Sequence, residues 1–311
     1  MAKLAFVFPG QGAQTVGMGK EFYDNYDIAK KLFDEADEAL GYSIKKMCFE
    51  GPEEDLRLTA NTQPAILVVS VIAGEILKSK GITPAIAGGH SLGEYSALVC
   101  ANVIDFKDAV VLVHKRGQFM QEAVPIGEGS MAAIIGLDDY TIVKACDKVT
   151  KEIGEVQAVN FNCPGQTVIA GTAKGVEAAV EELKAAGAKK AVILPVSAPF
   201  HSTLMAPAAK KLAAELAKVN FRDAEFPIAA NVNGELETKA EVIKQNLITQ
   251  ADHPVKWIAC VNSMVQFGAD TFVEAGPGKT LCGFNKRIDR KLVSLNVEDI
   301  ESLNKTLESL G

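Results

Sequence analysis

The hydrophobic positions of this chain fall into short continuous runs and longer stretches with helical spacing. The run LAFVF at residues 4–8 predicts a strand that is buried on both faces, and residues 84–89 predict a second one. Elsewhere, apolar residues three and four positions apart predict helices. Outside the middle of the chain, the other expected elements are helices over 64–80, 92–101, 106–122, 203–219 and 255–267, strands over 226–231 and 270–274, and a last helix after Glu298.

Two of these helices carry local signals at their ends. Asn61 or Thr62 can cap the first of them. Pro64 then falls in its first turn, and Gly81 lies just past its end. Asp105 stands directly before the helix that starts at residue 106, where a carboxylate commonly accepts hydrogen bonds from free N–H groups. We therefore expect Asp105 to be an N-cap.

The middle of the chain has its own order of elements. After the glycine-rich segment 126–130 come a strand, a helix, two strands, a helix and a final strand. This βαββαβ order is typical of ferredoxin-like domains. We therefore predict a small ferredoxin-like subdomain at 127–196, inserted into a larger α/β domain that comprises 1–126 and 197–311. Its strands are expected over 131–137, 156–162, 166–172 and 189–196, and its helices over 139–152 and 174–187.

Composition narrows the class of protein. Of the 311 residues, 48% are hydrophobic and 23% are charged, which is typical of a globular chain with a substantial core. The net charge of −7 argues against a surface built for nucleic acid or membranes, so any basic docking site must be local. The longest apolar stretch, 65–73, is too short to span a bilayer, and the N-terminal run is too short for a signal peptide.

Cysteine usage indicates a reducing compartment. No two cysteines are close enough to form a CxxC motif, and a chain of this length needs no disulfides to fold. Reduced thiols and a cytoplasmic location are therefore expected. The chain also has no HExxH motif and no spaced cluster of cysteines and histidines, so no metal site is predicted. The six cysteines are Cys48, Cys100, Cys146, Cys163, Cys260 and Cys282.

The clearest chemical signal is the sequence Gly89-His90-Ser91-Leu92-Gly93, a G-x-S-x-G pattern between a predicted strand and a predicted helix. A serine on such a strained turn projects its hydroxyl clear of the backbone, and the flanking glycines relieve crowding. The N–H of Leu92, at the start of the helix, points toward a reacting oxygen. Ser91 is therefore the predicted nucleophile, on a parallel sheet similar to that of α/β-hydrolases. The alternative is an ordinary glycine-rich turn.

A serine nucleophile needs a base, and the chain has four histidines. His90 is next to Ser91, where neighbouring side chains point apart, and His114 lies in the middle of a predicted helix. His201 follows a strand whose end can place it at the same sheet edge as Ser91, so it is the favoured candidate. His253 is the second choice.

No acidic third member of a catalytic triad is evident. The aspartates between Ser91 and His201 stand at predicted helix caps, at a turn and on a helix face. We therefore expect a serine–histidine dyad, with the histidine oriented by a neutral group such as a backbone carbonyl.

Arg116 is the second strong signal. Its neighbours at spacings of three and four in the helix 106–122 are all apolar, so it lies on the buried stripe. A buried guanidinium needs a partner, and its two parallel N–H groups match a carboxylate. The partner is either a substrate carboxylate or a protein acid such as Glu94, unless the side chain reaches out to water. Gln11, in the turn after the first strand, offers a second N–H to an oxyanion.

Six segments carry a wider resemblance. They are PGQGAQ (9–14), GHSLGEYSAL (89–98), Arg116 with Gly117 and Met120, NFNCPGQTVIAG (160–171), SAPFHS (197–202) and EAGPGKTL (274–281). Together they resemble the malonyl-CoA:acyl carrier protein transacylases, and the similarity runs through nearly the whole chain. By this resemblance Ser91 is the nucleophile and His201 the general base and acid. It further implies that the N–H groups of Gln11 and Leu92 form the oxyanion hole.

The resemblance also implies the parts of the site that bind substrate. The backbone carbonyl of Gln250 orients His201, and Arg116 holds the malonyl carboxylate, with Met120 beside it. Phe200 is similar to the malonyl-type residue that forms a wall against an α-methyl branch. His253 is a departure, because the family often has another residue before the proline at that place.

The implied reaction moves a malonyl group from CoA to the phosphopantetheine thiol of acyl carrier protein through malonyl-serine. Malonyl-CoA is a co-substrate, no bound cofactor is expected, and neither nucleic acid nor a membrane is an expected partner. A monomer is expected. Carrier proteins of this family are acidic, so a local basic patch is needed. The densest candidates are Lys286, Arg287, Arg290 and Lys291, followed by Lys189 and Lys190.

Three alternatives remain at this point. A serine thioesterase or other hydrolase would have a strand-end acid and no buried arginine. A malonyltransferase of polyketide synthesis would use the same residues as one of fatty-acid synthesis. A non-catalytic carrier-binding protein would not need both Ser91 and His201.

Overall fold

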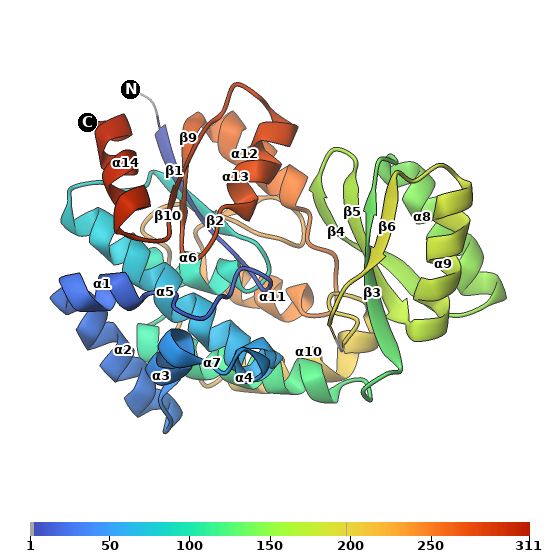
Figure 1. The fold of residues 1–311 in the computed structure, drawn as a ribbon, viewed down its shortest axis with the longest axis horizontal. Helices are drawn as coiled ribbons and strands as arrows, with labels where there is room; N and C mark the ends of the chain where they lie inside the picture. The colour runs from blue at the N-terminus through green and yellow to red at the C-terminus, as the bar shows by residue number, and fades with distance from the viewer. Residues whose placement is uncertain (1–2, 197) are drawn as a thin grey trace.

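The computed structural model describes residues 3–196 and 198–311. Ser197, the first residue of the predicted second part of the large domain and of the SAPFHS segment, lies outside the described residues. Two separate sheets organise the fold, one of six strands and one of four. Figure 1 shows the four-stranded sheet and its helices beside the larger body that contains both ends of the chain.

The larger sheet confirms the predicted α/β fold with a parallel sheet. Its strand order is β10-β9-β1-β2-β7-β8, and every neighbouring pair is parallel except β7 with β8. The run LAFVF lies in the central strand β1, where Ala5 to Phe8 are fully buried. The strands are β1 (Lys3–Phe8), β2 (Ile86–Gly89), β7 (Ile228–Ala229), β8 (Leu236–Glu237), β9 (Ala269–Ala275) and β10 (Val293–Val297).

The smaller sheet has the predicted βαββαβ order of elements. Its strands pair antiparallel in the order β4-β5-β3-β6, and α8 and α9 pack on one face around a core of their own. All of it comes from residues between Gly129 and Ile193. The elements are β3 (Gly129–Ile135), α8 (Asp139–Glu152), β4 (Val156–Cys163), β5 (Gln166–Thr172), α9 (Ala173–Ala185) and β6 (Lys190–Ile193).

Helix α5 (Thr59–Ser79) starts earlier than predicted and contains Pro64 in its interior. Proline has no N–H, so the carbonyl of Ala60 four residues before it loses its helical donor. The imidazole Nδ1 of His114 supplies a replacement at 2.8 Å. A tertiary contact therefore allows the helix to extend through the proline.

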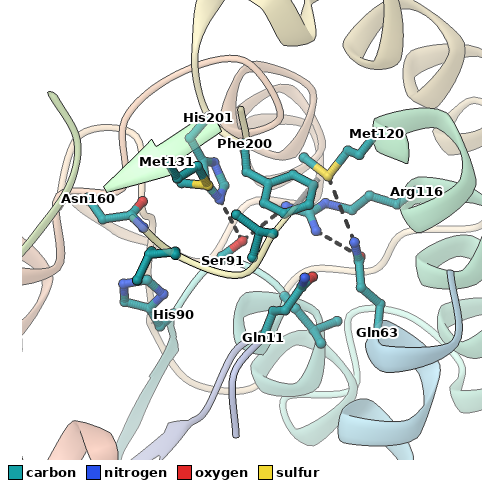
Figure 2. Close-up of a pocket in the computed structure, with 13 residues that line it drawn as sticks. Gln11, Gln63, His90, Ser91, Arg116, Met120, Met131, Asn160, Phe200 and His201 are labelled. Carbon is teal, nitrogen blue, oxygen red and sulfur yellow. Dashed lines mark hydrogen bonds between the residues drawn. The ribbon is translucent and has the colours of Figure 1, made fainter. Parts of the chain in front are cut away.

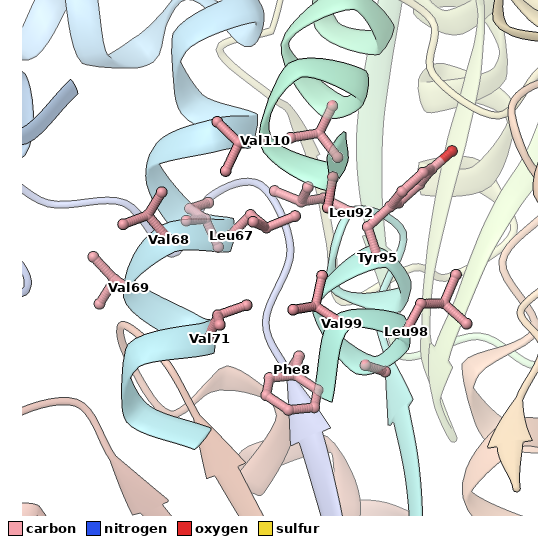
Figure 3. Close-up of a cluster of buried hydrophobic side chains, with 14 of the residues drawn as sticks. Phe8, Leu67, Val68, Val69, Val71, Leu92, Tyr95, Leu98, Val99 and Val110 are labelled. Carbon is pink, nitrogen blue, oxygen red and sulfur yellow. The ribbon is translucent and has the colours of Figure 1, made fainter. Parts of the chain in front are cut away.

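The same helix is apolar over a greater length than the uninterrupted run 65–73 suggested. By length and composition alone α5 is long and apolar enough to cross a membrane, although the longest uninterrupted apolar run was too short. In the fold, 83% of its apolar window is buried inside the protein. Figure 3 shows its side chains Leu67 and Val71 facing Phe8 of β1 and residues of α6 (Gly93–Cys100). This is the packing of a core helix.

Asp105 precedes helix α7 (Phe106–Glu122), but its side chain does not cap it. Its carboxylate instead accepts a hydrogen bond from Arg222 at 2.7 Å. By contrast, Asp138 before α8 does accept the N–H of Thr141. The capping prediction for Asp105 is therefore wrong, because a long-range cation competes for the same oxygen atoms.

Several segments without a predicted helix also form helices. Most of these helices are short, and short helices with few apolar positions give little periodic signal. The exception is α2 (Asp27–Leu40), whose 14 residues have a clear amphipathic pattern that the prediction missed. The predicted helix 203–219 is shorter than expected and begins with one 3₁₀ turn. The helices without a prediction are α1 (Lys20–Asn25), α2 (Asp27–Leu40), α3 (Ile44–Glu50), α4 (Glu53–Arg57), α11 (Ala240–Gln250) and α13 (Thr280–Ile288). The predicted helices at 203–219, 255–267 and after Glu298 are α10 (Ala206–Leu216), α12 (Trp257–Phe267) and α14 (Ile300–Leu310).

Candidate active site

Ser91 stands on a sharp turn between β2 and α6, with a φ of 52°. This left-handed conformation is unfavourable for any residue with a Cβ and places the hydroxyl clear of both elements. The turn needs glycine on each side. A Cβ on Gly89 would lie 1.9 Å from the carbonyl carbon of Gly93, and one on Gly93 would lie 2.0 Å from the oxygen of Phe8.

His201 lies directly against the serine. Its Nε2 is 2.7 Å from Ser91 Oγ, and its Nδ1 is 2.9 Å from the backbone oxygen of Gln250. A carbonyl oxygen can only accept, so Nδ1 carries the proton and Nε2 is free to accept the serine proton. The carbonyl belongs to the last residue of α11, where helix carbonyls have no helical partner.

The environment of His201 keeps its ring neutral. Burial, followed by the nearby positive charge of Arg116, lowers the pKa of His201 to about 3. A neutral imidazole is the form that accepts a proton. When the ring becomes charged during a reaction, the negative end of helix α11 lies beside it.

Arg116 approaches the serine from α7 and is 2% exposed. Its Nη1 donates to Gln63 Oε1 at 2.8 Å, and its Nη2 donates to Gln250 Oε1 at 2.9 Å and to Ser91 Oγ at 3.2 Å. The guanidinium thus has neutral partners here, and the amide of Gln250 lies between it and Glu94. Its positive charge has no directly bonded carboxylate among the described residues.

Two backbone N–H groups border the serine, those of Gln11 and Leu92. Neither has a hydrogen-bond acceptor within 3–196 or 198–311, and both residues line the cavity at Ser91. The side chain of Gln11 is held separately by Thr59. The two groups are thus available to an oxygen atom of a bound molecule.

A cavity of about 100 Å³ joins these groups. Figure 2 shows His201 and Arg116 on two sides of Ser91, with the rings and thioethers of Phe200, Met120 and Met131 closing the space around them. The full lining is Gln11, Gln63, His90, Ser91, Leu92, Arg116, Met120, Met131, Asn160, Leu194, Val196, Phe200 and His201.

The sequence did not point to Gln63 or Asn231. Gln63 is 1% exposed and accepts a hydrogen bond from Arg116. The sequence signal that could have identified Gln63 is its position as a polar residue directly before the apolar run of a helix. Asn231 is fully buried and binds the backbone of Ser91 at 2.7 Å. Its segment carries no local signal.

The remaining histidines are engaged elsewhere. His90 points away from Ser91 and binds Asn162 at 2.8 Å, and His253 binds Asp252 at 2.7 Å on the surface. His114 supports α5. In the described part of the chain, no group of three or more histidine, cysteine or acidic side chains is placed to hold a metal ion.

The predicted docking residues lie on and just after α13, on the surface. Lys286, Arg290 and Lys291 are exposed. Arg287 is exposed too, but its guanidinium donates to Gln166 Oε1 and to the oxygen of Pro164, both at 2.8 Å. Arg287 therefore ties α13 to the β4–β5 hairpin of the small sheet.

Comparison with known proteins gives a consistent relationship. The chain matches the acyl transferase domain family over residues 5–301. It is 50% identical to a malonyl CoA-acyl carrier protein transacylase of Bacillus subtilis over 310 residues, which covers 100% of this chain and 98% of that one. It is similar to the structure of an acyl carrier protein S-malonyltransferase of Vibrio cholerae, with a TM-score of 0.95, 48% identity, and coverage of 98% of this chain and 100% of that one.

A second solved structure is a malonyl-transacylase in complex with a type II polyketide acyl-carrier protein. It has a TM-score of 0.96 and 46% identity, and the match covers 99% of this chain and 100% of that one. These similarities extend over the whole described fold and include the strand–turn–helix that carries Ser91. The chain therefore belongs to the acyl transferase domain family, among the malonyl CoA-acyl carrier protein transacylases.

Proposed function

We propose that this protein transfers a malonyl group from CoA to the phosphopantetheine thiol of an acyl carrier protein, through a malonyl ester of Ser91. The observation that carries the proposal is the position of Ser91 Oγ, 2.7 Å from an imidazole nitrogen and 3.2 Å from a guanidinium. The first group activates a nucleophile, and the second binds a carboxylated acyl chain. The names of the relatives describe the same reaction.

In the first half-reaction, Ser91 Oγ attacks the thioester carbonyl while His201 Nε2 takes its proton. The carbonyl oxygen becomes an oxyanion, which the N–H groups of Gln11 and Leu92 stabilise. The C–S bond then breaks, and the CoA sulfur leaves with the proton from His201. Losing one oxyanion donor typically costs about 2.7–4 kcal/mol, so these two groups are a large part of the catalysis.

In the second half-reaction, the carrier thiol takes the place that CoA has left. His201 accepts its proton, the sulfur attacks the ester carbonyl of malonyl-Ser91, and the same two N–H groups hold the second oxyanion. The C–O bond breaks and Ser91 regains its proton from His201. The cycle is of the ping-pong type and needs no cofactor beyond the co-substrate malonyl-CoA.

Arg116 gives the reaction its selectivity. In the structure its guanidinium has only neutral partners, so a malonyl carboxylate entering the cavity provides the missing negative charge. Phe200 and Met120 are among the apolar side chains that line the small cavity, and they limit the room for a branched acyl chain. Acetyl groups fill the same space without pairing the arginine, so they bind less well.

The partner of the second step is an acidic acyl carrier protein, and its docking surface is the basic patch of Lys286, Arg287, Arg290 and Lys291. All six cysteines are free thiols, which supports a cytoplasmic location. A relative with 46% identity is in complex with a type II polyketide acyl-carrier protein, so carriers of both fatty-acid and polyketide synthesis are candidate partners.

The test follows the covalent intermediate by mass spectrometry. Incubation with malonyl-CoA should add one malonyl group to the wild type and none to Ser91→Ala. The adduct should persist in buffer and clear on addition of an acyl carrier protein that bears phosphopantetheine. Rapid clearance by water alone indicates a hydrolase, and the absence of an adduct rules out the proposed function.

A further inference from the structure

One buried side chain, that of Asn231, forms hydrogen bonds with the backbone of the strained turn at Ser91. Asn231 follows strand β7, which pairs with β2 only as far as Gly88 and Ala229. Beyond that point the backbone ladder stops, and the side chain of Asn231 continues it. Its Oδ1 accepts the N–H of Ser91 at 2.7 Å, and its Nδ2 donates to the oxygen of Gly89 at 2.8 Å.

These two hydrogen bonds restrain the backbone on both sides of the turn. The N–H of Ser91 and the carbonyl of Gly89 flank the residue between them, so one amide fixes both ends of the segment that carries the nucleophile. A φ of 52° at Ser91 persists only when the surroundings enforce it. The restraint consists of direct hydrogen bonds from a fully buried side chain.

Asn231 is itself fixed by Glu94, which is 2% exposed in the first turn of α6. Glu94 Oε2 accepts the backbone N–H of Asn231 at 3.2 Å and the Nε2 of Gln250 at 2.9 Å. The same Nε2 donates to the oxygen of Ser91 at 2.9 Å. One carboxylate oxygen thus orders two amides, and both amides bind the backbone of Ser91.

We infer that Asn231 and Glu94 are positioning residues for the acyl transfer, and that they act by holding the backbone of Ser91 in its strained conformation. Neither side chain touches the space where the acyl group binds, since neither lines the cavity. Their effect is therefore on the attack by Ser91 and not on the affinity for malonyl-CoA. This inference rests on the proposed function, since it assigns a role within the same reaction.

The first test is Asn231→Ala. We expect the rate of malonyl-Ser91 formation to fall about 100-fold, the usual result of displacing a reacting atom by an ångström, while KM for malonyl-CoA changes less than about 3-fold. Thr306→Val is the matched control. It also removes a buried hydrogen bond, from Thr306 to the oxygen of Asn296, but in the C-terminal helix.

A second pair of variants keeps the idea testable if Asn231→Ala does not fold. The oxygen of a glutamine can still accept both bonds of Glu94 Oε2, whereas alanine accepts neither. Glu94→Gln should therefore retain about ten times more of the acylation rate than Glu94→Ala. The double variant Asn231→Ala/Glu94→Ala should lose little more than the worse single variant, because the two residues act as one unit.

The outcomes separate this inference from the function on which it rests. A wild type that forms no malonyl adduct overturns the proposed function. A wild type that is acylated, with a folded Asn231→Ala acylated within about 3-fold of it, overturns the positioning role alone. Equal losses in Glu94→Gln and Glu94→Ala also overturn it, because the charge and not the hydrogen-bond geometry would then matter.

Discussion

The Nη2 of Arg116 lies 3.2 Å from the Oγ of Ser91, so the predicted substrate-binding cation contacts the predicted nucleophile directly. Its other partners are the amide oxygens of Gln63 and Gln250. A carboxylate that entered the cavity would draw the guanidinium away from the serine hydroxyl and neutralise its charge. We therefore propose that Arg116 acts on both the binding of the substrate and the state of the nucleophile.

Replacing Arg116 should reduce discrimination between acyl groups. We expect Arg116→Ala to lower kcat/KM for malonyl-CoA roughly 100-fold, about 3 kcal/mol, because a buried charge pair is lost. Acetyl-CoA has no carboxylate, so its kcat/KM should fall much less or rise. The measurement is acylation of Ser91 with each thioester in the wild type and the variant. An unchanged preference for malonyl-CoA rules out the carboxylate role.

The pH dependence of acylation should reflect the shifted pKa of His201. Because that pKa is lowered from 6.5 to about 3, the ring stays neutral on acidification, and kcat/KM should not show a fall centred near pH 6.5. Binding of a malonyl carboxylate offsets the charge of Arg116, so the acidic limb of kcat should lie at higher pH than that of kcat/KM. A single limb near pH 6.5 in both profiles contradicts this account.

Glu94 should make the protein less stable as the pH rises. Burial raises its pKa from 4.5 to about 7, so the folded state holds this proton more tightly than the unfolded state. The stabilisation is complete below about pH 4.5 and is lost as the pH rises through about 7.

Glutamine mimics the protonated acid and does not titrate. We therefore compare the free energy of unfolding of Glu94→Gln with that of the wild type at pH 4.5 and at pH 8, by urea denaturation. The difference, variant minus wild type, should be about 3 kcal/mol larger at pH 8 than at pH 4.5. Glu50→Gln, an exposed glutamate in α3, is the control. A difference in unfolding free energy that does not change with pH contradicts the raised pKa.

Carrier docking is best tested at Lys286. Arg287 also holds the β4–β5 hairpin, so its loss would confuse docking with a change in the structure. We expect Lys286→Glu to raise KM for the carrier protein about 10-fold and to leave acylation by malonyl-CoA unaltered, with the effect shrinking at high salt. Lys31→Glu, at an exposed position of α2, is the control. Equal KM values in the two variants place the carrier elsewhere.

Local sequence predicted most of the strands and the longest helix, and it pointed to the candidate nucleophile, whereas β8, β10, α2, α11 and α13 were not predicted. The G-x-S-x-G pattern could be recognised in the sequence because the turn that strains Ser91 depends on five neighbouring residues, with Gly89 and Gly93 approaching each other across it. The apolar neighbours of Arg116 predicted its burial for the same reason, since a helix face is set by spacing alone. The order of elements also predicted the small antiparallel sheet.

Only the tertiary structure decided what surrounds the serine. His201, Asn231 and Gln250 come from segments more than a hundred residues away, and no periodic pattern relates them to Ser91. The same applies to α5, which runs through Pro64 because His114 of another helix satisfies the freed carbonyl. A pattern in sequence reports the free-energy preferences of neighbouring residues, whereas these contacts exist only once distant strands and helices have packed together.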